Sequence, residues 1–363
     1  MSTKFSPEQF IGFLHDIDPL STYTIVQLSG GLVNFTVRAI KNTDANTGFF
    51  VGHKTLVIKH AAPFVAFIGE DAPLSPFRQV VESRALELLN ARSISQEVTI
   101  PSVLFHDNQR HMLVITDLGD DLSTIDKWIG TNPGGDKVAG VARRLSGFLA
   151  TLHTLDVPES SLQNLDNPDV VEAIERNVVD RVNDTLETFQ IEKKEARQLG
   201  EMLKTAYRAK PERWVFSVGD LWIGSILVSP LGEKVAVVDW ENAGRGKPLQ
   251  DLAQFASHFN NPSLKTTEEV LVKELFDSYR RGVSAANAGW IAPSSYRDEA
   301  IKSAWILHGR EILYRAGELP EGDIERLALA EHGLKYLRAA NGGLSRDDIL
   351  EERFLQSLYL SED

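Results

Sequence analysis

The chain has 363 residues, of which 42% are hydrophobic and 25% charged, as expected of a globular protein with one large or two medium domains. It contains no cysteine, which excludes disulfides, thiolate metal sites and a cysteine nucleophile. The formal net charge of −13 argues against a nucleic acid partner, because phosphate backbones attract basic proteins.

The N-terminal residues show no basic segment followed by an apolar run, so we expect no signal peptide. No apolar run approaches the roughly 20 residues that a membrane-spanning helix needs. We therefore expect a cytoplasmic protein without a membrane partner. The sequence does not indicate its oligomeric state.

The first third of the chain is rich in strand patterns. Apolar and polar residues alternate, as in half-buried strands. The predicted strands are 23–28, 35–40, 54–60, 101–104 and 111–116, with one helix at 76–91.

After Gly119 helical patterns dominate. Residues 136–155 carry an apolar stripe typical of an amphipathic helix, residues 168–209 are helical with a break near Gln190, and the chain beyond Leu264 is mostly helical. We predict an α+β protein with a small antiparallel sheet lobe at 1–118 and a larger, mostly helical lobe at 119–363.

One acidic hairpin interrupts the helical part. Asp220 precedes a strand at 226–228, and a second strand at 235–238 ends in Asp239 and Glu241. With the hydroxyl of Ser225, these carboxylates are expected to meet at the open end of the hairpin and to need a cation. Hard oxygen ligands suit Mg²⁺, which usually takes one or two carboxylates plus phosphates.

Lys59 and Glu82 form a candidate ion pair. Lys59 ends an apolar strand, and Glu82 lies in the helix that follows, with Glu87 as the competing partner. Such a lysine could hold phosphates while the glutamate orients it. Taken alone, each residue is a weak signal, because an exposed lysine at a strand end is favoured and charged helix residues usually face solvent.

Two loops could bind a nucleotide. Gly30 and Gly31 lie between two strands, which excludes a Walker or Rossmann turn but allows a β-turn that covers phosphates; a plain hairpin turn is the alternative. Backbone groups at Asp117 and Leu118 could pair with an adenine edge, or the segment is an ordinary connector.

Other chemistries find no support in the sequence. No His-Glu-x-x-His pair and no Gly-x-Ser-x-Gly elbow occurs, and His153 is expected to have a structural role at a helix end. The order Gly30-Gly31, Lys59, Glu82, connector, Asp220, Asp239 is instead that of a protein-kinase-like phosphotransferase.

The chain resembles the aminoglycoside phosphotransferase/choline kinase group of small-molecule kinases, and is similar to methylthioribose kinases and to the fungal kinase of 4-hydroxytryptamine. The segments that carry the resemblance are Leu28-Ser29-Gly30-Gly31-Leu32-Val33-Asn34-Phe35, Val57-Ile58-Lys59-His60-Ala61, Gly219-Asp220-Leu221-Trp222-Ile223-Gly224-Ser225 and Val238-Asp239-Trp240-Glu241.

The resemblance implies a bilobal protein-kinase-like fold and transfer of the γ-phosphoryl group of ATP to a hydroxyl of a small molecule, such as a sugar, an amino alcohol or a hydroxylated aromatic amine. It implies Asp220 as the catalytic aspartate, and Asp239 and Glu241 as Mg²⁺ ligands. The nucleotide-binding residues that it implies are Gly30, Gly31, Asn34, Lys59, Glu82, Asp117 and Leu118.

The acceptor site is the least specified part. Trp222 and Trp240 flank the carboxylates and are candidates for its wall, with core packing as the alternative, and Arg310 is a candidate contact for an anionic substrate. Only eleven residues separate Asp239 from Asp251, which leaves little room for a peptide-binding segment and argues against a protein kinase.

Two residues depart from the family pattern. Val218 stands where the family usually has histidine, and Ser225 where most members have a metal-binding asparagine, although methylthioribose kinases also carry serine. These departures motivate an alternative function, a pseudokinase-like nucleotide-binding protein without turnover. Asp251 matches a family aspartate that is expected to anchor hydrogen bonds.

Overall fold

The computed structural model describes residues 6–28, 31–260, 266–286 and 295–352. The elements of its N-terminal part are α1 (Pro7–Ile17), β1 (Tyr23–Gln27), β2 (Phe35–Lys41), β3 (Thr55–His60), β4 (Phe64–Val65), β5 (Gly69–Pro73), α2 (Arg78–Arg92), β6 (Val98–Thr99), β7 (Val103–Asp107) and β8 (Met112–Thr116).

The remaining elements are mostly helices. They are β9 (Ser123–Thr124), α3 (Ile125–Gly130), α4 (Gly135–His153), α5 (Glu159–Gln163), α6 (Pro168–Ile174), the π-helix η1 (Glu175–Val179), α7 (Val182–Glu187), α8 (Lys193–Arg208), β10 (Val215–Ser217), the 3₁₀ turn η2 (Ile223–Ser225), β11 (Ile226–Val228), β12 (Val235–Val237), β13 (Gly244–Gly246), α9 (Gln250–Ser257), α10 (Thr266–Ala285), α11 (Ser295–Glu318), α12 (Ile324–Asn341) and α13 (Arg346–Glu351).

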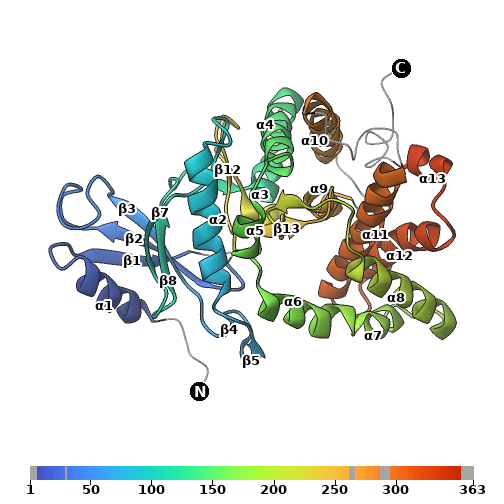
Figure 1. Ribbon diagram of the computed structural model, residues 1–363, viewed down its shortest axis with the longest axis horizontal. Helices are drawn as coiled ribbons and strands as arrows, with labels where there is room; N and C mark the ends of the chain where they lie inside the picture. Colours follow the sequence, from blue (N-terminus) through green and yellow to red (C-terminus); the bar gives the residue numbers. More distant parts are fainter. Residues whose placement is uncertain (1–5, 29–30, 261–265, 287–294, 353–363) are drawn as a thin grey trace.

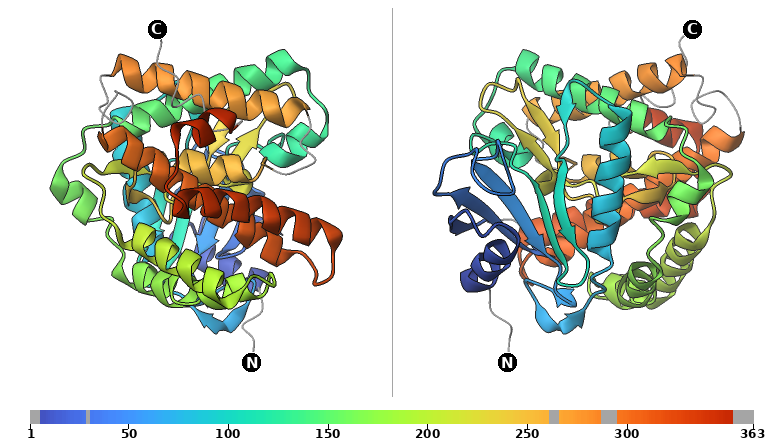
Figure 2. Two further views of the ribbon diagram at one scale, coloured as in Figure 1. Left: turned by 90° about the vertical axis from the view of Figure 1, so that its right-hand side faces the viewer. Right: turned by 60° about the vertical axis from the view of Figure 1, so that its left-hand side comes forward.

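An antiparallel five-stranded sheet in the order β1-β2-β3-β8-β7 forms the N-terminal lobe. Helix α1 lies on one face of this sheet and α2 on the other (Figures 1 and 2). Because side chains alternate along a strand, Leu56 and Ile58 of β3 join the core under α1, whereas Val57 packs on the other side.

The larger lobe is built on helices. Helix α4 buries residues at helical spacing, including Val138, Val141, Leu145, Phe148 and Leu152, and packs against α10. Helix α11 packs against α9 and α12. The hairpin β11–β12 belongs to a separate four-stranded sheet, in the order β6-β12-β11-β9, beside these helices.

The predicted α+β, two-lobed architecture is confirmed, with the sheet lobe at one end and the helices at the other (Figure 1). The predicted strand at 101–104 lies instead at 103–107, and the short strands β4, β5, β6, β9, β10 and β13 were not predicted. The predicted break near Gln190 is present, because Gln190 has a left-handed backbone with φ of 60°. None of the helices among the described residues is both long enough and apolar enough to cross a bilayer.

Candidate active site

Lys59 is buried between the two lobes and has two carboxylate partners. It follows Val57 on the α2 side of β3, and its Nζ lies 2.6 Å from Glu82 Oε1 and 2.6 Å from Asp239 Oδ1. Burial alone would lower the pKa of Lys59, but the charges of Asp239 and Glu82 raise it above its ordinary value. The ammonium therefore stays charged, and it links β3, α2 and the hairpin.

Glu82 is the partner of Lys59, as predicted. It is 1% exposed, whereas Glu87 lies on the solvent side of α2. Its Oε1 also accepts a hydrogen bond of 3.3 Å from the backbone N–H of Trp240. Glu82 thereby fixes both the lysine and the chain segment that leaves β12.

The carboxylates of the hairpin do not form the shared acidic cluster that we predicted. Among the described residues, no three His, Asp or Glu side chains converge as a metal cage. Asp239 pairs with Lys59, and Glu241 Oε2 accepts a 2.6 Å hydrogen bond from Asn34 Nδ2. Asp239 and Glu241 thus each have a partner in the other lobe, whereas the partner of Asp220 lies in its own lobe.

Asp239 has an unusual backbone. Its φ of 64° is left-handed, a region that non-glycine residues rarely adopt, and such strain is concentrated at functional sites. Its side chain is 34% exposed although it pairs with buried Lys59. The carboxylate therefore meets solvent at the cleft and remains accessible to a ligand.

Asp220 is held by a residue that the sequence analysis missed. Gln254, on α9, donates its side-chain N–H to Asp220 Oδ1. Burial raises the pKa of Asp220, the charges of Asp239 and Asp251 raise it further, and the hydrogen bond from Gln254 partly opposes them. A raised pKa makes this carboxylate a better proton acceptor than an ordinary aspartate.

Asp251 holds the loop that carries Asp220 through hydrogen bonds to the residues before Asp220. The Asp251 carboxylate accepts hydrogen bonds from Ser217 Oγ (2.7 Å) and from the backbone N–H groups of Val218 (2.9 Å) and Gly219 (3.2 Å). Burial works against the charge of Asp251, but the hydrogen bonds from His153 and from this loop keep its pKa below the usual range.

His153 in turn holds the carboxylate of Asp251. Its Nε2 lies 3.0 Å from Asp251 Oδ2 and its Nδ1 lies 2.7 Å from the hydroxyl of Tyr279, all within the core. The ring therefore has the structural role that we expected.

Two other hairpin residues are engaged locally. Ser225 is 0% exposed; its hydroxyl donates to the carbonyl of Trp222 (2.8 Å) and accepts from the Trp222 N–H (3.1 Å). This closes the η2 turn and leaves one lone pair of the hydroxyl for any further ligand. Trp222 itself is half-buried.

Trp240 packs in the core, which is the alternative to its place as a candidate for the pocket wall. The residue is 0% exposed, its ring packs edge-on against Phe148 at 6.1 Å, and its indole N–H donates to the carbonyl of Val237. Trp240 thus enters the core between Asp239, which pairs with Lys59, and Glu241, which accepts from Asn34.

The loop of Gly30 and Gly31 and the connector at Asp117 and Leu118 are the two predicted nucleotide-binding segments. Gly31 is exposed just before Asn34, and Gly30 lies outside the described residues. At the connector, the Asp117 carboxylate accepts two hydrogen bonds, of 2.6 and 2.9 Å, from the guanidinium of Arg38. Leu118 is the next residue in the chain, so the ion pair of Asp117 with Arg38 also restrains its backbone.

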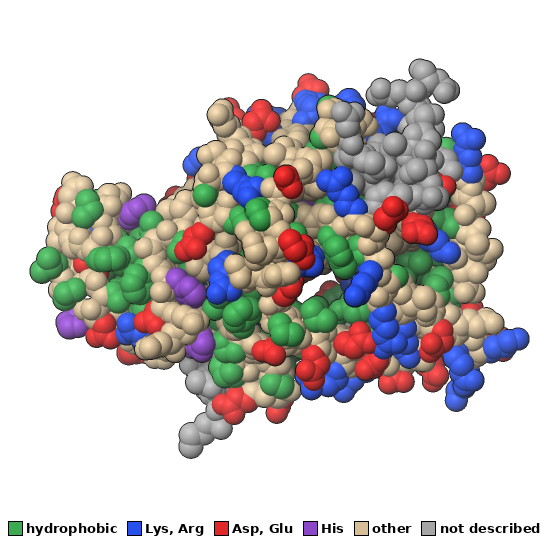
Figure 3. Space-filling model, viewed as in Figure 1, with side chains coloured by type: hydrophobic (Ala, Val, Ile, Leu, Met, Phe, Trp, Pro, Cys, Tyr) green, Lys and Arg blue, Asp and Glu red, His purple; other side chains and the backbone are tan. Residues whose placement is uncertain are grey.

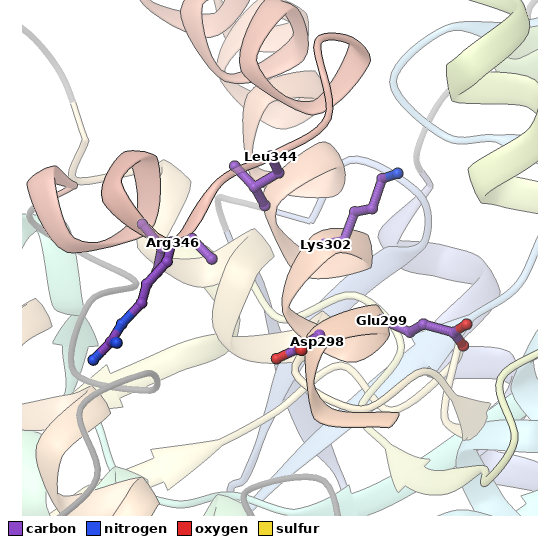
Figure 4. A pocket seen from close by; sticks show the side chains of 6 residues that line it. Asp298, Glu299, Lys302, Leu344 and Arg346 are labelled. Atoms are coloured by element: carbon purple, nitrogen blue, oxygen red, sulfur yellow. The ribbon is translucent and has the colours of Figure 1, made fainter. Parts of the chain in front are cut away.

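Arg310, on α11, lies close enough to Asp220 for the two charges to interact. Burial lowers its pKa, while the nearby Tyr207 and the charge of Asp220 raise it, and its Nη2 bonds to the carboxylate of Glu311. Figure 3 shows the surface hollowed within the helical lobe, just above α6 in this view. A separate pocket of about 220 Å³ lies between the start of α11 and the loop before α13, and none of the predicted site residues lines it (Figure 4).

Comparison with known proteins identifies the family. The family model for the phosphotransferase enzyme family matches residues 46–298, more than half of the chain. This chain belongs to the phosphotransferase enzyme family. The match includes Lys59, Glu82 and the whole hairpin.

Similar curated proteins are methylthioribose kinases. Those of Bacillus cereus (strain G9842) and Bacillus thuringiensis (strain Al Hakam) are 29% and 28% identical over 236 residues. Each match covers 60% of this chain and 58% of the relative, so the chain spans less than two thirds of the length of these proteins.

Solved structures share the fold. A putative aminoglycoside phosphotransferase from Ralstonia eutropha JMP134 aligns with a TM-score of 0.55 over 93% of this chain and 98% of that chain, at 12% identity. The gentamicin complex of APH(2")-IIa aligns with a TM-score of 0.51 over 95% and 98%, also at 12% identity. At these identities the likeness shows the fold alone.

Gly219 is required by geometry, which gives a first prediction. Its φ is 87°, and a Cβ at this position would lie 1.9 Å from the carbonyl oxygen of Asn242. We expect Gly219→Ala to lower the free energy of unfolding by at least about 1 kcal/mol, from the backbone conformation alone. Urea unfolding measures this change.

The matched control for that variant is Gly147→Ala. Gly147 lies on the exposed side of α4, and a Cβ added there would have no other atom within 4 Å. Alanine there should raise the free energy of unfolding by about 0.5–1 kcal/mol. Equal stability of the two variants would contradict the close approach at Gly219.

Glu241 gives a pH prediction. Burial raises its pKa to about 7 despite the nearby charge of Lys59. Between the ordinary value of 4.5 and about 7 the folded state binds more protons than the unfolded state, so this residue's contribution to stability is lost as pH rises through about 7.

Urea unfolding of the wild type and Glu241→Gln across pH 5–8 tests this expectation. The glutamine is neutral throughout, so relative to the wild type the variant should gain about 1–3 kcal/mol between pH 5 and pH 8. Parallel curves for the two proteins would show that Glu241 titrates normally.

Proposed function

We propose that this protein is an ATP-dependent phosphotransferase that moves the γ-phosphoryl group to a hydroxyl of a small molecule. The observation that carries the proposal is the ion-pair network of Lys59, Glu82 and Asp239, with Asp220 on the adjoining loop. Membership of the phosphotransferase enzyme family and the similarity to methylthioribose kinases support it.

The site fits Mg²⁺ bound together with a nucleotide. Since no cage of three acids is built among the described residues, the protein by itself supplies few ligands, as is usual where phosphates complete the shell. Asp239 and Glu241 would hold the ion, and the remaining lone pair of Ser225 is a further candidate. Bound there, Mg²⁺ would neutralise phosphate charge.

The nucleotide would lie under the glycine loop. Lys59 would exchange its bond to Asp239 for the phosphates while Glu82 keeps it oriented. Gly30 and Gly31 would cover the phosphates, and the backbone of Asp117 and Leu118 would pair with the adenine edge.

Asp220 would act on the acceptor. Gln254 occupies Oδ1, so the other carboxylate oxygen would accept the proton of the acceptor hydroxyl. That hydroxyl oxygen forms a bond to the γ-phosphorus, the bond from the γ-phosphorus to the β–γ bridging oxygen breaks, and ADP leaves. Positioning and charge stabilisation supply most of the rate in such reactions.

The acceptor would bind beside Asp220, between Trp222 and the helices. Arg310, whose charge acts on Asp220 from α11, would contact an acceptor that carries an anionic group. Since the named relatives are methylthioribose kinases, thio-substituted and ordinary pentoses are the first acceptors to test, followed by amino alcohols and hydroxylated aromatic amines.

The alternative is a nucleotide-binding protein without turnover. The departures at Val218 and Ser225 raised it, but the loop bonds to Asp251 use the backbone of Val218 and the Ser225 hydroxyl closes its own turn. No observation favours this alternative.

Replacing Asp220 tests the proposal. Asp220→Asn keeps the size of the side chain but cannot accept the proton, so kcat should fall by about 10²–10⁴-fold in an assay of ADP release with Mg-ATP and the acceptor panel. Asp136→Asn, an exposed carboxylate on α4, should retain wild-type rates. The proposal is wrong if the wild type turns over no acceptor, or if Asp220→Asn is as fast as the wild type.

Arg310 gives a second test, specific to the acceptor site. Arg310→Gln should raise KM for the acceptor by about tenfold, the loss of one charge-assisted contact, and leave KM for ATP within about twofold. Steady-state kinetics with each substrate varied in turn separate these constants. A change confined to KM for ATP would assign Arg310 to the nucleotide side.

A further inference from the structure

A buried arginine, Arg78, stands next to the nucleotide cleft with its hydrogen-bonding capacity filled. The residue is 1% exposed. Its five N–H groups match five acceptors: Nε donates to Asn34 Oδ1 (3.0 Å), Nη1 to the carbonyls of Leu74 (3.3 Å) and Ser75 (2.9 Å), and Nη2 to those of Val33 (3.4 Å) and Ala62 (2.8 Å). Only a guanidinium has this number of donors.

These acceptors belong to separate segments around the cleft. Val33 and Asn34 are in the glycine loop, Ala62 follows β3, and Leu74 and Ser75 lie between β5 and α2. The β4–β5 hairpin also holds the loop, since the N–H groups of Ala66 and Phe67 donate to the carbonyls of Val33 and Leu32. Arg78 is therefore the common anchor of the loop.

The hydrogen bonds of Arg78 continue through Asn34 to Glu241 in the other lobe. Because Asn34 Oδ1 faces Arg78, the amide nitrogen of Asn34 points to Glu241, to which it donates at 2.6 Å. Arg78 Nε also lies 3.6 Å from Glu241 Oε2. The side-chain amide of Asn34 thus joins the glycine loop to Glu241, which follows the β11–β12 hairpin.

We propose that Arg78 is a positioning residue that acts through Asn34 to set the distance between the glycine loop and Glu241, and so the closure of the cleft on Mg-nucleotide. This inference rests on the proposed function. It gives Asn34 a role across the lobes, in addition to the predicted place in the nucleotide site, and it adds Arg78, which the motifs did not indicate.

The test compares Arg78→Lys with a matched control, Lys41→Met. Lys41 is also a buried cation of the same lobe, 0% exposed, but its Nζ bonds to the carbonyls of Thr47 and Phe50, within the same sheet lobe and away from the hairpin. Both changes remove buried hydrogen bonds, so both should lower the melting temperature.

Only Arg78→Lys should weaken the affinity for Mg-ADP, measured by calorimetry on the folded protein. We expect a loss of about tenfold, the value of one charge-assisted hydrogen bond, against less than about twofold for Lys41→Met. Mg-ADP is used as the probe so that the result does not depend on knowing the acceptor.

Asn34→Ala provides the second variant, because Asn34 is half-buried in the loop and its truncation leaves the core intact. If Arg78 acts through Asn34, the double variant should bind Mg-ADP no more than about twofold more weakly than Asn34→Ala alone. This non-additivity keeps the inference testable even where Arg78→Lys is much less stable.

The outcomes separate the two proposals. Wild-type protein that does not bind Mg-ADP would overturn both. Wild-type binding with equal losses in Arg78→Lys and Lys41→Met, or with additive losses in the double variant, would overturn the positioning role of Arg78 and leave the phosphotransferase proposal standing.

Discussion

The charge of Lys59 is the constraint on which the rest of the site depends. An ammonium at this depth is unfavourable unless carboxylates and hydrogen bonds compensate it. Glu82 supplies one carboxylate from α2 and Asp239 the other from the hairpin, so the three elements have to meet at one point. Removing either acid would leave the buried ammonium with one carboxylate partner instead of two. The ion pairs of Lys59 therefore hold the two lobes together at this point.

That constraint explains why some of the site was predictable from the sequence. Alternation along 55–60 puts Lys59 on the face opposite Leu56 and Ile58, and a helix follows on that face. Glu82 falls on the buried side of that helix with Val81 and Leu86, whereas Glu87 does not. Periodicity excludes Glu87 but does not select Glu82 by itself, because the first turns of α2, residues 78–83, are buried on all sides.

The remaining contacts depend on tertiary placement that periodicity does not encode. Gln254 could have been suspected, since it lies three residues after Asp251 on one helix, but nothing local says that it reaches Asp220. Arg78 resembles an ordinary charged helix residue until the loop, the hairpin β4–β5 and Glu241 are placed around it.

The incorrect predictions have the same origin. We expected Asp220, Asp239 and Glu241 to meet as one acidic cluster because they flank the same hairpin, but Asp239 and Glu241 each find a partner in the other lobe. Trp240 follows the left-handed Asp239, a backbone turn that the sequence pattern does not show, and its ring packs in the core.

Val218 stands where the resemblance leads one to expect histidine, and its surroundings show what the Asp220 loop requires. Asp251 bonds to the backbone N–H groups of Val218 and Gly219 and to the hydroxyl of Ser217, and His153 supports Asp251 from behind. These bonds do not involve the side chain at position 218, which is 0% exposed and needs only to be apolar and to fit. The position of Asp220 is thus set by the backbone of its loop, by the left-handed Gly219 and by Gln254. A valine in this place is therefore compatible with an intact Asp220 loop.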